Sequence, residues 1–211
     1  MTAIVWGKHD NKTYFNGIDR GVVYTSSLSE PWDGLVSVEN KSTGGDTEDL
    51  YLDGIKRGTL TNPEFYSGTI KAFSAPSIVE SALGNTSIGG GLFAESSIRS
   101  TFSMCYRSFV GNESSASSDY RIHFLYNLSV KKPTIVNETR DDGGDLDALT
   151  YEVSSTPDLT IVNQPPSYHL YVDTRAITSP AKLFALENFL YGTVSITPSM
   201  PTALQLKTMM S

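Results

Sequence analysis

Two neighbouring stretches of the sequence alternate between apolar and polar residues with a period of two. In residues 101–110, the positions predicted to share one face of a strand are Phe102, Met104 and Tyr106. Residues 119–130 repeat the pattern, and the positions predicted to share one face are Tyr120, Ile122, Phe124, Tyr126 and Leu128. A period of two is typical of a β-strand. Because the intervening residues 111–118 are polar, the two stretches predict a long antiparallel hairpin.

Other segments predict more strands and few helices. Residues 149–154 and 168–172 also alternate, and residues 32–39, 54–60 and 66–73 read as strands. Residues 179–191 predict a helix, because Ser179 and Pro180 suit its start and leucines recur at helical spacing before Gly192. A weaker helical signal covers residues 77–83.

These elements indicate a mainly β, α+β fold in which the helices lie to one side. A chain of 211 residues fits one all-β domain, so we expect a single domain over residues 1–211. The helix at 179–191 would flank the sheet, and residues 193–211 would form a C-terminal segment.

A polar, glycine-containing segment lies between the strand predicted at 32–39 and the next one. We predict that residues 40–54 form a long loop, since most hairpin connections take roughly 2–5 residues. Residues 41–52 of this loop begin polar and end with three apolar residues, 50–52, which favours docking on another surface. The candidate interface residues are Asp46, Glu48, Asp49, Leu50 and Tyr51 of this loop, with Asn112 and Glu113 of the 111–118 turn. We expect Tyr51 to be the anchor, because interfaces are enriched in aromatic residues.

Charge and cysteine content exclude several classes of function. The formal net charge of -7 argues against a basic nucleic-acid footprint. The single cysteine, Cys105, excludes an internal disulfide framework and a thiolate-rich metal cluster, and we predict that it lies in the core. The N-terminus has no secretory-signal pattern, and no window is apolar over the ~18 residues of a membrane span.

No motif predicts a metal, a cofactor or a catalytic centre. The histidines, His9, His123 and His169, are far apart in sequence and lack zinc-ligand spacing. Residues 89–94 match a permissive dinucleotide pattern without its flanking strand and helix, so we interpret them as a glycine-rich turn. Residues 141–147 cluster acids without the order of a calcium loop, which favours a solvated turn. A Ser/His/Asp triad is defined in space and stays open at this point, although no nucleophile-elbow motif is present.

The ordered series of motifs resembles the major tail protein, or tail tube protein, of long non-contractile-tailed bacteriophages (siphophages). The landmarks run in that family's order from about residue 31 to residue 192. They are 32–35 with 44–46, 49–51 with 53–56, 102–107 with 111–112, 120–123, 155–157 and 183–192. The match is poorest at residues 76–95, where the family commonly has a more acidic and aromatic helix.

The resemblance implies a tail-tube β sandwich or barrel with a flanking helix and a long interface loop. It implies a structural, non-enzymatic virion protein whose hexameric rings stack into the hollow tail tube that delivers the genome. The implied partners are further copies of the chain, a tape measure protein, and tail tip and tail terminator proteins. Double-stranded DNA would pass through without specific binding, no membrane would be involved, and the chain would be made in the host cytoplasm.

We hypothesise that the acidic charge then serves as a channel lining that repels phosphate. At physiological salt such repulsion reaches only about 8 Å from the wall. Glu152, on the polar face of its predicted strand, is the candidate lumen-facing acid. The alternative function is a phage decoration or adhesion protein that binds a host surface glycan, and an enzyme is the third reading.

Overall fold

The computed structural model describes residues 13–62, 64–112, 115–136, 147–157 and 168–211, and for residues 112 and 115–118 only the backbone. The fold is mainly β, with antiparallel sheets and a few helices, which confirms the predicted class. None of the helices in these ranges has the length and apolar character needed to cross a membrane.

One large antiparallel sheet forms the body, with strand order β2-β1-β9-β10-β11-β6-β3. Its central strand, β10, pairs with β9 along most of its length, with β12 over Arg121–Leu125 and with β11 over Leu128–Val130. The strands of this sheet are β1 (Thr13–Tyr24), β2 (Ser29–Pro31), β3 (Leu35–Gly44), β6 (Glu64–Ala72), β9 (Phe102–Asn112), β10 (Ser115–Val130), β11 (Leu149–Ser155) and β12 (His169–Asp173). The predicted strands at 149–154 and 168–172 are therefore confirmed.

The sheet curls into a partly open barrel around the larger of two cores. Gly21 of β1 approaches β3 so closely that a Cβ there would lie 2.9 Å from Leu35 Cδ2. No ladder joins β1 to β3 within the ranges described, so the two strands meet at this seam only through packing, and the barrel is partly open there. Its interior is filled by aromatic and aliphatic side chains from both halves, among them Trp32, Tyr66, Ile70, Phe102, Met104, Tyr106, Leu125 and Tyr151.

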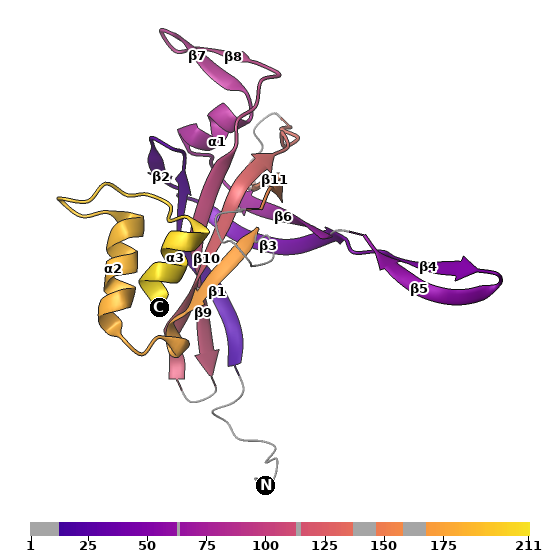
Figure 1. Cartoon of the computed structure of the whole chain (residues 1–211). Coiled ribbons are helices and arrows are strands. Elements are labelled where there is room, and N and C mark those ends of the chain that lie inside the picture. The colour runs from indigo at the N-terminus through magenta and orange to yellow at the C-terminus, as the bar shows by residue number, and fades with distance from the viewer. Residues whose placement is uncertain (1–12, 63, 113–114, 137–146, 158–167) are drawn as a thin grey trace.

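Two C-terminal helices, α2 (Pro180–Tyr191) and α3 (Ala203–Met210), cover the opposite face of β1, β9 and β10 (Figure 1). The helix predicted at 179–191 is confirmed, although the Ser179 side chain makes no capping hydrogen bond. Leu186 and Leu190 are buried, and the Tyr24 hydroxyl donates a hydrogen bond to the Leu190 carbonyl at 2.9 Å. Cys105 is buried in this second core, as predicted.

Helix α1 (Ser77–Ala82) lies at one end of the barrel and confirms the weaker helical signal. It buries Ile78, Val79 and Ala82 in the larger core. The Glu30 carboxylate accepts hydrogen bonds from the Ser77 hydroxyl and the Ile78 amide, so β2 supplies an acidic cap for the helix N-terminus.

The prediction that residues 40–54 form a long loop is wrong. β4 (Thr47–Leu52) and β5 (Ile55–Thr61) form a hairpin that projects from the β3–β6 end of the body (Figure 1). Its turn is Asp53-Gly54, with φ of 53° and 72°, and an Asp-Gly pair with positive φ at both positions is a favoured two-residue hairpin turn. We call residues 47–61 the arm.

Two smaller expectations also change. Strands β9 and β10 extend to Asn112 and from Ser115, so most of the turn predicted at 111–118 is strand. Leu128 does not share a face with Tyr126, because a register irregularity at Asn127 (φ 47°) places Leu128 in the barrel core. Asn accepts this left-handed conformation more readily than most residues do.

Candidate assembly surfaces

The arm has one apolar and one polar face. Cross-strand partners are Glu48 with Leu60, Leu50 with Gly58, and Leu52 with Ile55, and the β-strand alternation places Glu48, Leu50 and Leu52 on one face. The other face carries Asp49, whose carboxylate pairs with Lys56 at 2.6 Å and accepts a hydrogen bond from the Thr59 hydroxyl at 3.2 Å. The arm is therefore amphipathic, with its internal polar contacts on one side only.

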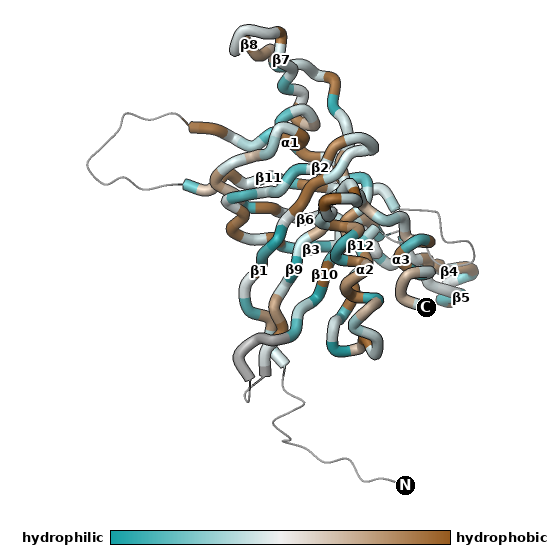
Figure 2. Tube along the Cα trace, turned by 90° about the vertical axis from the view of Figure 1, so that its left-hand side faces the viewer, coloured by the Kyte–Doolittle hydropathy of each residue, from teal (hydrophilic) through white to brown (hydrophobic). Residues whose placement is uncertain are grey.

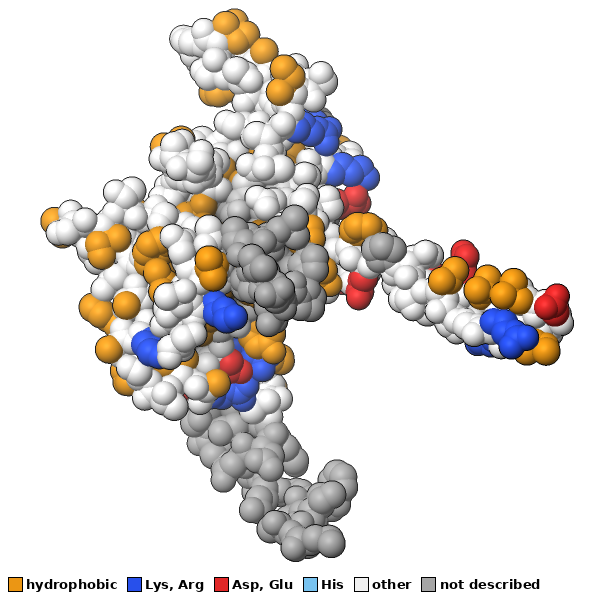
Figure 3. Space-filling view, viewed as in Figure 1, with side chains coloured by type: hydrophobic (Ala, Val, Ile, Leu, Met, Phe, Trp, Pro, Cys, Tyr) orange, Lys and Arg blue, Asp and Glu red, His pale blue; other side chains and the backbone are white. Residues whose placement is uncertain are grey.

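Nothing in the described part of the chain covers the apolar face. Leu50, Leu52, Ile55 and Leu60 are between 41% and 58% exposed, and Figure 3 shows apolar side chains along the surface of the arm. An isolated two-stranded hairpin is at best marginally stable in water. An exposed apolar face on a projecting hairpin therefore indicates a contact with another molecule.

The predicted contact residues take different places on the arm. Glu48 and Leu50 lie on the apolar face, whereas Asp49 is engaged in the polar contacts within the hairpin. Tyr51 pairs across the strands with Lys56 and is 60% exposed, on the polar side. Asp46 lies before the arm, and its carbonyl accepts a hydrogen bond from the Asn62 amide at 2.9 Å.

Sequence reasoning missed Ile55 and Leu60, because it placed them in a separate strand. The Asp53-Gly54 pair was the signal that would have brought them to the same face as Leu50 and Leu52. Of the second predicted contact region, Asn112 ends β9 and pairs with Ser115, and Glu113 lies outside the described residues.

A second hairpin projects from the α1 end of the body. It consists of β7 (Asn85–Gly89) and β8 (Leu92–Glu95), joined at Gly90-Gly91. The turn interpreted at residues 89–94 is therefore confirmed only for Gly90 and Gly91, and the rest of that range is strand. Ile88, Leu92 and Phe93 are exposed on it. It stands clear of the body in both Figure 1 and Figure 2. The molecule thus presents two apolar hairpins in different directions.

The strands β3 and β12 of the body, like the short β2 at the other end of the sheet, also have a free edge within the described ranges. Within the described ranges β3 pairs only with β6, and β12 pairs only with β10. A free edge carries unpaired backbone donors and acceptors that another strand can bind.

The outward face of β3, β6 and β11 is mostly polar, with Phe65 as an exposed apolar side chain, and lacks the helices that cover the other half of the sheet. Its acids are paired with lysines: Glu152 lies 2.8 Å from Lys131, and Glu39 lies 3.0 Å from Lys41. The hydrogen bond from Lys131 lowers the pKa of Glu152. The predicted lumen-facing acid is thus exposed, but its charge is locally balanced.

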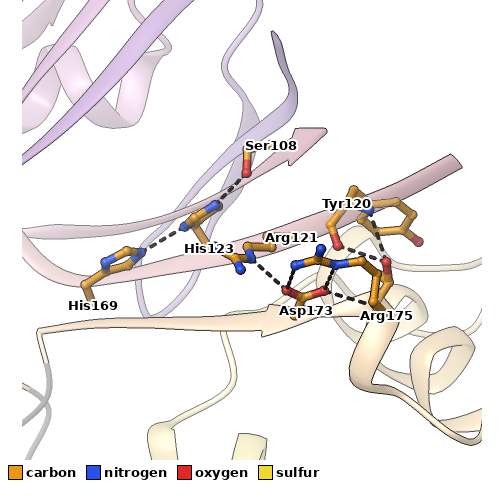
Figure 4. Close-up of polar contacts among 8 residues, drawn as sticks. Ser108, Tyr120, Arg121, His123, His169, Asp173 and Arg175 are labelled. Carbon is orange, nitrogen blue, oxygen red and sulfur yellow. Dashed lines mark hydrogen bonds and ion pairs between the residues drawn. The ribbon is translucent and has the colours of Figure 1, made fainter. Parts of the chain in front are cut away.

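Three polar side chains form a row inside the barrel (Figure 4). The Ser108 hydroxyl lies 2.8 Å from His123 Nε2, and His123 Nδ1 lies 2.9 Å from His169 Nε2. Strand pairing thus brings together two histidines that are far apart in sequence. The His123 ring also stacks on Tyr106, with 4.6 Å between ring centroids and 6° between the planes. Burial lowers the pKa of both histidines, that of His123 to about 3.

The Ser108–His123 pair has the contact of a nucleophile with its base, but its surroundings favour packing. Both side chains are buried, and the low pKa makes His123 a weak base. β9 pairs with β1 on one side and with β10 on the other. Its backbone amides near Ser108 are therefore engaged in strand pairing and are poorly placed to bind an oxyanion. The described residues also include no cluster of three or more His, Cys, Asp or Glu side chains that could hold a metal ion. His9 lies outside the described residues.

A charged cluster beside this row holds β12 against β10. The Asp173 carboxylate contacts Arg175 at 2.7 Å and Arg121 at 2.8 Å (Figure 4). These hydrogen bonds, that of Arg175 above all, keep the pKa of Asp173 well below its usual range. Two cations thus share one anion, and the contact between Arg121 of β10 and Asp173 of β12 links the two strands.

A scan of the sequence against models of known protein families finds no match, and a search of curated proteins finds none either.

Proposed function

We propose that this chain is a structural virion protein that assembles into hexameric rings, which stack into the hollow tail tube of a long non-contractile-tailed phage. The observation that carries the proposal is the arm, a projecting hairpin whose apolar face has no cover in the described chain. If the arm binds a different surface on the next copy, the contact is heterologous, that is, it joins two different surfaces of identical chains. Such contacts generate rings or open stacks of identical copies.

The other surfaces support the same function. The free edges of β3 and β12 offer strand pairing between neighbours, and a closed ring of sheets removes such edges. The β7–β8 hairpin gives a second apolar contact in a different direction. Contacts in two directions are what a stack of rings requires: one set within a ring and one set between rings.

The outward face of β3, β6 and β11 fits the wall of the channel. Most of its side chains are polar, and its acids Glu39 and Glu152 are paired with lysines. Lys71 adds a third lysine, without an ion pair among the described residues, so the face carries only a small net charge. We expect double-stranded DNA to slide past it with weak adsorption. In this proposal Glu152 faces the lumen as half of an ion pair. The tube would be completed by a tape measure protein and by tail tip and tail terminator proteins.

The test is electron microscopy of the purified protein at low and high concentration. We expect rings or hollow tubes with sixfold end views for the unaltered chain. The double variant Leu50→Asp/Leu52→Asp removes the apolar face of the arm and should give dispersed particles with an unchanged thermal unfolding midpoint. Val194→Asp is the matched control, since it places a charge at a fully exposed apolar residue remote from the arm, and it should assemble normally.

The proposal fails if the unaltered chain stays dispersed at every concentration and also after addition of tail-tip seeds. Binding of the dispersed protein to host surface glycans would then favour the decoration or adhesion function instead. Tubes that form equally well from the arm variant would remove the arm from the interface.

A further inference from the structure

An apolar groove lies between β12 and α3. It has a volume of about 310 Å³ and is lined by residues 170–172 of β12 and by Ala203, Leu206, Lys207 and Met210 of α3. Three consecutive residues of β12 line it, although successive side chains of a strand point to opposite faces. The groove therefore follows the free edge of β12, where both backbone groups and side chains are accessible.

The groove has the features of a site for an added strand. The edge of β12 that faces away from β10 supplies backbone groups that pair with no strand of the described residues, and Leu206 and Met210 supply an apolar wall beside it. A strand that pairs with such an edge gains backbone hydrogen bonds, and every second side chain enters the groove. Lys207 lies on the groove and forms no ion pair with any acid of the described residues. The fitting occupant is an extended segment with alternating apolar residues and an acid on the same face.

Strand β4 has this pattern. Leu50 and Leu52 share a face with Glu48, and Glu48 has no ion pair among the described residues. The arm projects away from α3 in its own molecule (Figure 1), so β4 cannot enter the groove of the same chain in this conformation. The occupant that the pattern and the charge complementarity select is therefore β4 of a second copy.

We propose that β4 of one copy adds to the free edge of β12 in the next copy. Leu50 and Leu52 enter the groove against Leu206 and Met210, and Glu48 faces Lys207. This inference rests on the proposed tube function and names the surface that receives the arm. The contact is heterologous, because the arm and the groove are different parts of the chain, and so it repeats from copy to copy.

Cross-linking between two differently tagged populations tests the contact. One population carries Leu52→Cys, the other carries Met210→Cys, and the mixture is assembled and treated with a short bis-maleimide. Cys105 is buried and should not react. We expect a cross-linked pair that carries both tags. Ile88→Cys on the β7–β8 hairpin replaces Leu52→Cys in the control mixture, which should give no such pair. Tubes that form without the Leu52–Met210 product overturn this inference and leave the tube function standing, whereas the absence of any assembly, seeded or not, overturns both.

A charge swap gives an independent readout that needs no cysteine. Glu48→Lys and Lys207→Glu should each raise the protein concentration required for tube formation by about two- to fivefold, the range expected for an exposed ion pair. The double variant in one chain should restore the original concentration. Failure of the double variant to restore assembly, or normal assembly of both single variants, contradicts the pairing of β4 with this groove.

Discussion

The buried histidine pair makes the stability of this fold sensitive to mild acid. His123 lies between the rings of Tyr106 and His169, and burial lowers its pKa to about 3. In the unfolded chain a histidine has a pKa of about 6.5. Below pH 6.5 the unfolded state therefore binds a proton that the folded state does not. The contribution of neutral His123 to stability is complete above about pH 6.5 and is lost as the pH falls from there toward 3.

The size of the effect follows from that interval. Each pH unit between the two pKa values changes the free energy of unfolding by about 1.4 kcal/mol. Between pH 7.5 and pH 5.5, only the pH unit below about 6.5 lies between the two pKa values. His123 should therefore account for a loss of about 1.4 kcal/mol in the free energy of unfolding. His169, whose pKa is also lowered, adds to the loss in the same direction.

Urea unfolding at pH 7.5 and 5.5 measures this loss, and the variant His123→Gln separates it from the carboxylates. The variant should lose less stability than the unaltered chain over the same pH change, by about 1.4 kcal/mol. Carboxylate contributions are common to both proteins and cancel in the comparison. Histidine ring signals in NMR spectra give the pKa directly. A titration midpoint of His123 near 6.5, or the same pH dependence in both proteins, would refute the reasoning.

Three further predictions concern the second core, a buried cation and the arm. Leu186→Ala should lower the free energy of unfolding by about 2–5 kcal/mol in urea titrations, since the side chain is fully buried beneath α2. Asp19→Ala removes the carboxylate that accepts two hydrogen bonds from the Arg107 guanidinium, which is only 10% exposed, and should cost about 1.5–3 kcal/mol in the same assay. Gly54→Val forces a β-branched residue into φ 72° at the tip of the arm, so it should hinder tube formation in electron micrographs while leaving the thermal unfolding midpoint of the body unchanged.

Most of the body could be predicted from local sequence patterns. The alternation in β9 and β10 and the leucine spacing of α2 each reflect burial of one face, and burial is encoded in the order of residues. Helix α3 was not predicted within 193–211, although Thr202 and Gln205 form a capping box whose spacing is visible in the sequence. The arm was not predicted as a hairpin, because a long polar segment favours a loop unless Asp53-Gly54 is recognised as a two-residue turn.

Features set by strand pairing could not be predicted from single segments. The contact of His123 with His169 depends on which strand lies beside β10, and no local pattern specifies that neighbour. The change of face at Leu128 depends on a single backbone irregularity at Asn127. The groove beside β12 likewise exists only because a helix from the end of the chain packs next to that strand.

The connection between the arm and the body has a mechanical consequence. Gly44 and Gly45, with φ of 93° and 75°, lie where β3 ends and the arm begins, and the Asn62–Asp46 hydrogen bond spans this connection. Glycine permits wide backbone rotation, so this connection is a place where the arm can pivot while its own ladder and that of the body stay intact. If the arm bridges successive copies, bending strain in a long filament would concentrate at these pivots. The filament would then curve under load by many small rotations, and none of its docked surfaces would need to separate.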